Sequence, residues 1–264
     1  MRISLIQMDV AFGDPAVNQR RVAKKLAQVV EREHPDVVAL PEMWNAGYDL
    51  TRLDRIADRG ELVEWMGQKS REYGITLMGG SIAEVKDGGH YNASYVFSPQ
   101  GDVVAQYRKL HLFRLMEEEK FLLPGPEGPV TFPIGGYRAG MIICYDVRFP
   151  EMVRSLALEG AELLFVSAEW PHPRLNHWRI LNQARAIENQ MAVAAINRVG
   201  SDPNNTFCGH SMVLDPWGKV LAEGGEGEET LTVDLELAEV ARIRRQIPVF
   251  EDRVPHMYRI GVSP

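Results

Sequence analysis

The hydrophobic positions of the chain follow a helical spacing in some segments and a strand-like pattern in others. Apolar residues that recur every three or four positions predict amphipathic helices, as Val22, Leu26 and Val29 do near the start. Short apolar or alternating runs bounded by turn residues predict strands. The expected helices are residues 18–32, 61–73, 150–160 and 175–189, with one more before the C-terminal tail. The expected strands are residues 2–10, 36–44, 75–85, 90–99, 103–110, 138–144, 161–170, 191–199, 211–216, 218–224 and 229–235.

The order of these elements predicts an α/β fold. Strands alternate with helices at first and later follow one another through short turns, which indicates both parallel and antiparallel pairing. We expect mixed sheets covered by helices, and two stacked sheets would accommodate the strands. The turn at residues 98–101 echoes the turn at 215–218, although no strong internal repeat is present. No linker or low-complexity tract divides the chain, so residues 1–264 are expected to form one domain.

Composition and charge argue against several classes of function. The formal net charge is −7, which disfavours a nucleic-acid partner, because such affinity rests on clustered Lys and Arg. No apolar stretch approaches the roughly 20 residues that cross a bilayer, so no membrane insertion is expected. The two cysteines, Cys144 and Cys208, cannot build a disulfide framework, and the first ten residues lack the features of a signal peptide. These features predict a cytoplasmic protein.

Cys144 occupies a position that suits a nucleophile. It ends an apolar strand and precedes a predicted helix, so it lies in a strand-to-helix turn. There the helix dipole and free backbone N–H groups are expected to favour the reactive thiolate. The string CYDVRFPE places polar residues beside the thiol, which apolar packing would not require. The alternative interpretation is an inert buried cysteine.

Two further polar residues stand at the ends of predicted strands. Glu42 follows the apolar run VVALP, and Lys109 follows VVAQYR. A nucleophilic cysteine needs a base, and the seven histidines offer no papain-type signature. Each residue taken alone is interpreted more simply as a surface charge at a strand exit. Three polar strand ends in one chain favour a common site instead.

These three segments resemble the signature motifs of the nitrilase-like carbon–nitrogen hydrolases. The matching strings are PEMW around Glu42, YRKLHLF around Lys109 and CYDVRFPE around Cys144, and the similarity continues to the tail IPVFEDRVP. It thus covers nearly the whole chain. The resemblance implies a four-layer α-β-β-α sandwich and a homodimer. Within the family, RKLHLF, Trp170-Pro171 and ARAIENQ are most similar to the ω-amidase and 2-oxoglutaramate amidase branch.

The resemblance also implies a mechanism and the roles of four catalytic residues. Cys144 would attack an amide carbon to form a thioester, with Glu42 as general base and water completing the cycle. Lys109 and the backbone N–H of Tyr145 would stabilise the oxyanion. A second glutamate is implied near the lysine, and its position fits Glu118 best. Its rivals in the same acidic run are Glu117 and Glu119, and a solvated helix face is the simpler interpretation of that run.

The substrate-binding residues are less well determined by the sequence. A substrate carboxylate needs a cation or a ring of N–H donors. The candidate cations are Arg148, Arg174, His177 and Arg114. Tyr48 and Trp170 are candidates for the pocket wall, although a tryptophan beside a proline more often serves packing.

No cofactor is expected. His172 and His177 lie close in sequence, but no third ligand arrives at metal-binding spacing, so no metal site is predicted. No glycine-rich string for a dinucleotide or nucleoside triphosphate is present. The expected partners are water and a small aliphatic amide, most simply an ω-amide of a dicarboxylic acid such as 2-oxoglutaramate or 2-oxosuccinamate.

Two groups of alternatives remain open from the sequence. One is a hydrolase of the same fold that acts on other amides, nitriles, N-carbamoyl compounds or deaminated glutathione. The other is a noncatalytic scaffold or a redox-sensing thiol protein. The presence of Glu42, Lys109 and Cys144 argues against this second group.

Overall fold

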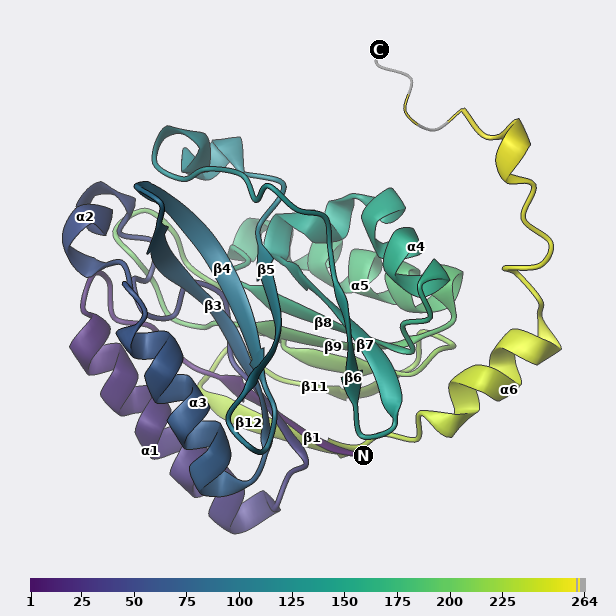
Figure 1. Cartoon of the computed structure of the whole chain (residues 1–264), viewed down its shortest axis with the longest axis horizontal. Coiled ribbons are helices and arrows are strands. Elements are labelled where there is room, and N and C mark those ends of the chain that lie inside the picture. The colour runs from purple at the N-terminus through teal and green to yellow at the C-terminus, as the bar shows by residue number, and fades with distance from the viewer. Residues whose placement is uncertain (260, 262–264) are drawn as a thin grey trace.

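Two six-stranded β-sheets pack face to face, with helices on their outer faces (Figure 1). This computed structural model describes residues 1–259 and 261. The helices are α1 (Pro15–Glu33), α2 (Leu53–Ile56), α3 (Glu61–Tyr73), α4 (Pro150–Leu158), α5 (Leu175–Asn189) and α6 (Ala238–Gln246). The strands are β1 (Arg2–Gln7), β2 (Val37–Ala39), β3 (Thr76–Lys86), β4 (Gly89–Phe97), β5 (Val103–Arg108), β6 (Thr131–Ile134), β7 (Tyr137–Ile143), β8 (Leu163–Ala168), β9 (Ala192–Asn197), β10 (Met212–Leu214), β11 (Val220–Glu223) and β12 (Glu229–Asp234).

The two sheets share one pattern of strand pairing. In the first sheet, β1, β2 and β3 are parallel neighbours, and β4 and β5 extend the sheet as antiparallel hairpins. In the second sheet, β7, β8 and β9 are parallel, and β10 and β11 follow in the same way. The similar turns at residues 98–101 and 215–218 occupy equivalent places in the two sheets. The first joins β4 to β5, and the second joins β10 to β11. The sheets are therefore related in topology although their sequences repeat weakly.

Helices cover both outer faces, which gives the expected four-layer α-β-β-α sandwich. Helices α1 and α3 lie on the first sheet, and α4 and α5 lie on the second (Figure 1). Successive side chains of a strand point to opposite faces. In β1, Leu5 therefore packs between the sheets, whereas Ile6 packs with Val22 and Leu26 of α1. Among the described residues, no helix has the length and apolar character needed to span a bilayer.

Most predicted elements are confirmed, and the exceptions have local causes. Helices α3 and α5 have the predicted bounds, and Asp14 caps α1 by accepting a hydrogen bond from the Val17 N–H. Strand β6 was not predicted because Pro133 interrupts its pattern. It lies at the edge of its sheet, where proline is tolerated in a strand. Helix α2 is a single turn and also lacked a sequence signal.

A kink in β3 fixes the segment that follows β2. The pairing register of β3 shifts between Met78 and Ser81, and Gly80 there has a positive φ of 65°. A Cβ atom at Gly80 would lie 2.1 Å from the carbonyl oxygen of Pro41, so only glycine fits this approach. The hydroxyl oxygen of Ser81 accepts a hydrogen bond from the Met43 N–H at 3.0 Å. These contacts hold the residues on both sides of Glu42.

Candidate active site

The three polar strand ends meet in one buried cluster at the interface of the sheets. Glu42 follows β2 and Lys109 follows β5 in the first sheet, and Cys144 follows β7 in the second. All three side chains are buried. The Lys109 Nζ atom lies 2.9 Å from Glu42 Oε1. The interpretation of Glu42 and Lys109 as surface charges is therefore wrong.

Glu118 is the member of the acidic run that joins this cluster. It is fully buried in a single 3₁₀ turn, and its Oε1 atom lies 2.7 Å from Lys109 Nζ. Its other oxygen accepts a hydrogen bond from the Phe113 N–H at 3.0 Å. Glu117 and Glu119 are exposed. The interpretation as a solvated helix face thus fits these two neighbours and not Glu118.

Tyr48 and Asn92 complete the hydrogen bonds of the cluster. The Tyr48 hydroxyl lies between the carboxylates of Glu42, at 2.8 Å, and Glu118. The Asn92 amide group donates to Glu42 Oε1 at 2.8 Å. Sequence reasoning placed Tyr48 only in the pocket wall and did not identify Asn92. An asparagine inside an alternating strand such as β4 gives no signal that separates it from an ordinary polar position.

The second oxygen of Glu42 is held by the opposite sheet. Glu42 Oε2 accepts a hydrogen bond of 2.8 Å from the backbone N–H of Glu169, which follows β8. Glu169 itself is fully buried. The carboxylate of Glu42 is therefore fixed from both sheets at once, which leaves it little freedom to turn away from Cys144.

Opposite charges keep Lys109 protonated, and burial has the larger effect on Glu118. Burial alone would lower the pKa of Lys109, but Glu118 and Glu42 raise it well above its ordinary value. Lys109 therefore remains a cation. Burial raises the pKa of Glu118 despite the attraction of Lys109, and the charge of Glu42 raises it further.

The Cys144 thiol is held in its neutral form. Burial raises its pKa well above the ordinary value, and the charge of Glu42 raises it further, while Lys109 lowers it. The expected stabilisation of the thiolate by a helix dipole is wrong. Residues Cys144–Arg148 form a short 3₁₀ turn, and α4 begins only at Pro150, so no long helix points its N-terminus at the sulfur.

Asp146 fixes the turn that carries the thiol. Its carboxylate accepts hydrogen bonds from the Ile143 N–H at 3.0 Å and from the Tyr107 hydroxyl at 2.8 Å. It also contacts the ring of His111 at 2.8 Å. The backbone of Cys144 has a positive φ of 45°, a conformation that costs energy in any residue except glycine. The surrounding contacts therefore hold Cys144 in a strained conformation.

A pocket opens directly onto the cluster. Besides Cys144, it is lined by Tyr48, Phe113, Met116, Tyr145, Arg148, Glu169, Trp170, Pro171 and Arg174. Four of the six candidate substrate-binding residues, Tyr48, Arg148, Trp170 and Arg174, are therefore at the pocket. His177 does not line the pocket and instead contacts Arg148 at 3.3 Å.

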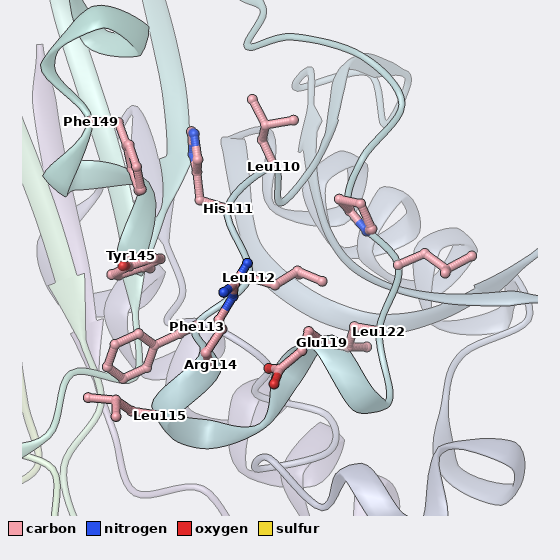
Figure 2. Close-up of a pocket in the computed structure, with 12 residues that line it drawn as sticks. Leu110, His111, Leu112, Phe113, Arg114, Leu115, Glu119, Leu122, Tyr145 and Phe149 are labelled. Atoms are coloured by element: carbon pink, nitrogen blue, oxygen red, sulfur yellow. The ribbon is translucent and has the colours of Figure 1, made fainter. Parts of the chain in front are cut away.

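A second, larger groove lies beside this pocket. It has a volume of about 680 Å³ and contains Arg114, and Phe113 and Tyr145 border both spaces (Figure 2). Arg114 therefore belongs to the groove and not to the pocket of Cys144.

His172 pairs with Glu226 at 3.3 Å. Within the described residues, no group of three or more His, Cys, Asp or Glu side chains is arranged to hold a metal ion.

Comparisons with known proteins agree with this geometry. The family model described as carbon-nitrogen hydrolase matches residues 2–245. The 2-oxoglutaramate amidase of Bacillus subtilis (strain 168) is 44% identical over 97% of this chain and 98% of its own length. The omega-amidase of Mus musculus is 34% identical over 98% of this chain and 97% of its own length.

Solved structures show the same architecture. A CN-hydrolase superfamily protein of Xanthomonas campestris with an arsenic adduct in its active site has a TM-score of 0.89 and 31% identity, over 96% of this chain and 97% of its own. A Glu-to-Gln mutant of the amidase of Nesterenkonia sp. AN1 carries the acetamide moiety of fluoroacetamide on its active-site cysteine. It has a TM-score of 0.84 and 28% identity, over 94% of this chain and 96% of its own. The chain belongs to the carbon–nitrogen hydrolase family.

Proposed function

We propose that the protein is a thiol amidohydrolase that cleaves ω-amides of dicarboxylic acids, such as 2-oxoglutaramate or 2-oxosuccinamate, and releases ammonia. The observation that carries this proposal is a single pocket that joins Cys144 and its buried carboxylates to two arginines. The similarity to an enzyme described as 2-oxoglutaramate amidase over nearly the whole chain supports the same substrate class.

Glu42 and Cys144 carry the covalent steps in this proposal. Glu42 accepts the thiol proton while the sulfur attacks the amide carbon, which suits a thiol whose pKa is raised at rest. The C–N bond then breaks, the nitrogen takes the proton from Glu42, and ammonia leaves a thioester. Glu42 next removes a proton from water, which attacks the thioester. The C–S bond breaks, and the sulfur recovers its proton from Glu42.

Lys109 and the backbone N–H of Tyr145 stabilise the oxyanion of each tetrahedral intermediate. Lys109 suits this role because Glu118 and Glu42 keep it charged and hold it at 2.7 and 2.9 Å. A well-placed donor of this kind contributes about 3 to 4 kcal/mol to the barrier reduction. Glu118 acts as the fourth member of the set because it fixes Lys109 without a contact to solvent.

Arg148 and Arg174 bind the carboxylate at the other end of the substrate. The Arg148 guanidinium lies 4.9 Å from the Trp170 ring centre, and that of Arg174 lies 5.4 Å from the Phe113 ring centre. Burial lowers the pKa of Arg148, and the charge of Arg174 contributes to the lowering. Two cations that repel each other in one pocket favour an anion between them.

Ammonia release from a panel of amides tests this function. The panel contains 2-oxoglutaramate, succinamate, glutamine, deaminated glutathione, propionamide and a simple nitrile, each with the wild type and with Cys144→Ala. We expect the dicarboxylate monoamides to be the best substrates and the variant to be inactive. If a neutral amide or the nitrile leads, the substrate assignment is wrong. If every compound is inert, the scaffold alternative is favoured.

Substitution of the arginines tests the carboxylate site separately. We expect Arg148→Met and Arg174→Met each to raise the KM for succinamate about 10- to 100-fold, because a charge-assisted hydrogen bond contributes about 1.5 to 3 kcal/mol. Propionamide lacks the carboxylate and serves as the matched control, so its KM should change little. Equal increases for both amides would contradict a carboxylate site.

We infer in addition that residues 1–264 form one hydrolase domain that assembles as a homodimer. The family model ends at residue 245, but Phe250 beyond it packs against Arg154 and Arg244, which supports continuity of the domain. Residues 260 and 262–264 lie outside the described part of the chain. Helices α4 and α5 present the exposed apolar residues Leu158, Ile180 and Ile187, which supports an interface on this face.

A further inference from the structure

Glu169 has a buried carboxylate oxygen that lacks a hydrogen-bond partner in the described part of the chain. The side chain is fully buried and lines the pocket of Cys144, and the unpartnered atom is Oε1. A buried polar group without a partner costs about 1 to 3 kcal/mol, so such groups are rare unless they have a function. The mechanism proposed above uses only the backbone N–H of Glu169.

Arg198 holds this carboxylate in place. Its Nη1 atom donates to Glu169 Oε2 at 3.0 Å. Arg198 is itself fully buried, donates to Asp9 Oδ1 at 3.0 Å and to the Val10 carbonyl at 2.8 Å, and lies over the Phe207 ring. With one oxygen fixed on an immobile guanidinium, the carboxylate cannot turn to satisfy the other oxygen within the protein. The free oxygen is therefore available to a molecule in the pocket.

Glu169 lies close to Glu42, where it can contact the leaving nitrogen of a bound amide. Its N–H contacts Glu42 Oε2. Burial raises the pKa of its carboxyl group to about 8, although the charge of Arg198 lowers it, so the free oxygen is an acceptor in the ionised form that prevails above this pH. Lys109 contacts the other oxygen of Glu42. Because Lys109 and the Glu169 backbone approach different oxygens of Glu42, an amide whose carbonyl oxygen is directed at Lys109 can direct its nitrogen toward Glu169.

We propose that Glu169 is a specificity-determining residue whose free oxygen accepts a hydrogen bond from the carboxamide NH₂ group of the substrate. This proposal rests on the amidase function proposed above and defines its substrate class as primary amides. An ester presents only an oxygen acceptor at the same position, and two acceptors facing each other repel. The contact also strengthens during the reaction, because the nitrogen gains positive character when it takes the proton from Glu42.

The variant Glu169→Gln tests this contact by reversing its polarity. The glutamine oxygen can still accept from Arg198, so its NH₂ group faces the pocket and offers a donor where the wild type offers an acceptor. We compare kcat/KM for succinamate and for monomethyl succinate, which share the carboxylate and differ in the leaving group. The comparison is made at a pH of about 9, where a carboxyl group with a pKa of about 8 is ionised. The amide-to-ester ratio should fall about 10- to 100-fold, the size expected for a hydrogen bond to a charged group.

Glu84→Gln is the matched control for the loss of a buried ion pair. Glu84 is also buried and pairs with Arg108 at 2.9 Å, but it does not line the pocket. This variant should leave the amide-to-ester ratio unchanged. If Glu169→Gln lowers both rates by the same factor, Glu169 has only a structural role and the proposal is overturned.

A failure of the proposed function would give a different result. If the wild type hydrolyses propionamide but not succinamate, the dicarboxylate assignment fails, and the ratio is measured with propionamide and methyl propionate instead. If it hydrolyses no amide, the amidase function fails, and calorimetry with Cys144→Ala compares the binding of succinamate and monomethyl succinate. Equal affinities with and without Glu169→Gln would then overturn the role of Glu169.

Discussion

At the scale of single residues, the protonated state of Cys144 follows from its neighbours more than from its place in the chain. The sulfur is buried beside Glu42, and both factors raise the pKa of the thiol. A reactive cysteine is often recognised by a lowered pKa. Here the thiol and the carboxylate form an acid–base pair in which the proton stays on sulfur until a substrate carbon is in place.

We therefore predict that the Cys144 thiolate forms only above the ordinary thiol pKa of about 8.5. The measurement is the ultraviolet absorbance of the thiolate during a pH titration, taken as the difference between the wild type and Cys144→Ser. The difference removes the contribution of Cys208, whose pKa is raised to about 11 by burial. A thiolate already formed at neutral pH would contradict the buried acid–base pair.

The sequence predicted some site residues and missed others for a physical reason. Glu42, Lys109 and Cys144 interrupt apolar strands at their ends, so each leaves a visible change in the hydrophobic pattern. Glu169 also follows an apolar strand, β8, so its position carries the same signal, but no base or lysine role was assigned to it. Asn92 lies inside β4 and reaches Glu42 only through a contact between strands that are far apart in sequence. Periodicity along the chain does not encode such contacts.

At the scale of elements, the turn after β7 combines a buried strand end with a strained residue. Cys144 has a φ of 45°, which glycine adopts without penalty. Both Cys144→Gly and Cys144→Ala remove the nucleophile, so their comparison isolates the backbone. The free energy of unfolding of Cys144→Gly should exceed that of Cys144→Ala by about 1 kcal/mol.

Chemical denaturation of the two variants measures this difference. Cys208 is the matched control, because it is also buried but is not among the residues with positive φ. At Cys208 the glycine variant should be less stable than the alanine variant, because glycine there loses more entropy on folding. The same order at both positions would show that strain does not decide the stability of the turn.

Local pattern also limited the prediction of elements. Strand β7 follows from a continuous apolar run, whereas β6 contains Pro133 and pairs with a neighbour on one side only. The two strands form an antiparallel hairpin, which depends on the order of strands in the sheet and not on the local pattern. In β2 the pattern predicts too long a strand. Its apolar run continues through Leu40, although the strand ends at Ala39.

At the scale of the whole molecule, helices α4 and α5 of the second sheet carry three exposed apolar residues, Leu158, Ile180 and Ile187. Residues 247–259 pass beside α4, where Phe250 packs against Arg154, and helices α4 and α5 contact each other on the second sheet (Figure 1). We predict that Leu158→Asp and Ile180→Asp convert the proposed dimer to a monomer, because a charge in an apolar interface is costly to desolvate.

Light scattering measures the mass of each variant in solution. Val103→Asp is the matched control, because Val103 is similarly exposed but belongs to the first sheet. It should leave the mass unchanged. A wild type with the mass of one chain would contradict the dimer itself.

The buried ionic cluster between the sheets also has a consequence for evolution. Lys109, Glu42 and Glu118 are withdrawn from water, and replacing such an ionic set with well-packed hydrophobic groups of similar volume is often neutral or stabilising by about 1 to 4 kcal/mol. The combined variant Glu42→Leu, Lys109→Met and Glu118→Leu should therefore be inactive and unfold at the same or a higher urea concentration, whereas Lys109→Met alone should unfold at a lower one. A lineage that lost the need for catalysis would be free to drift toward such apolar sets.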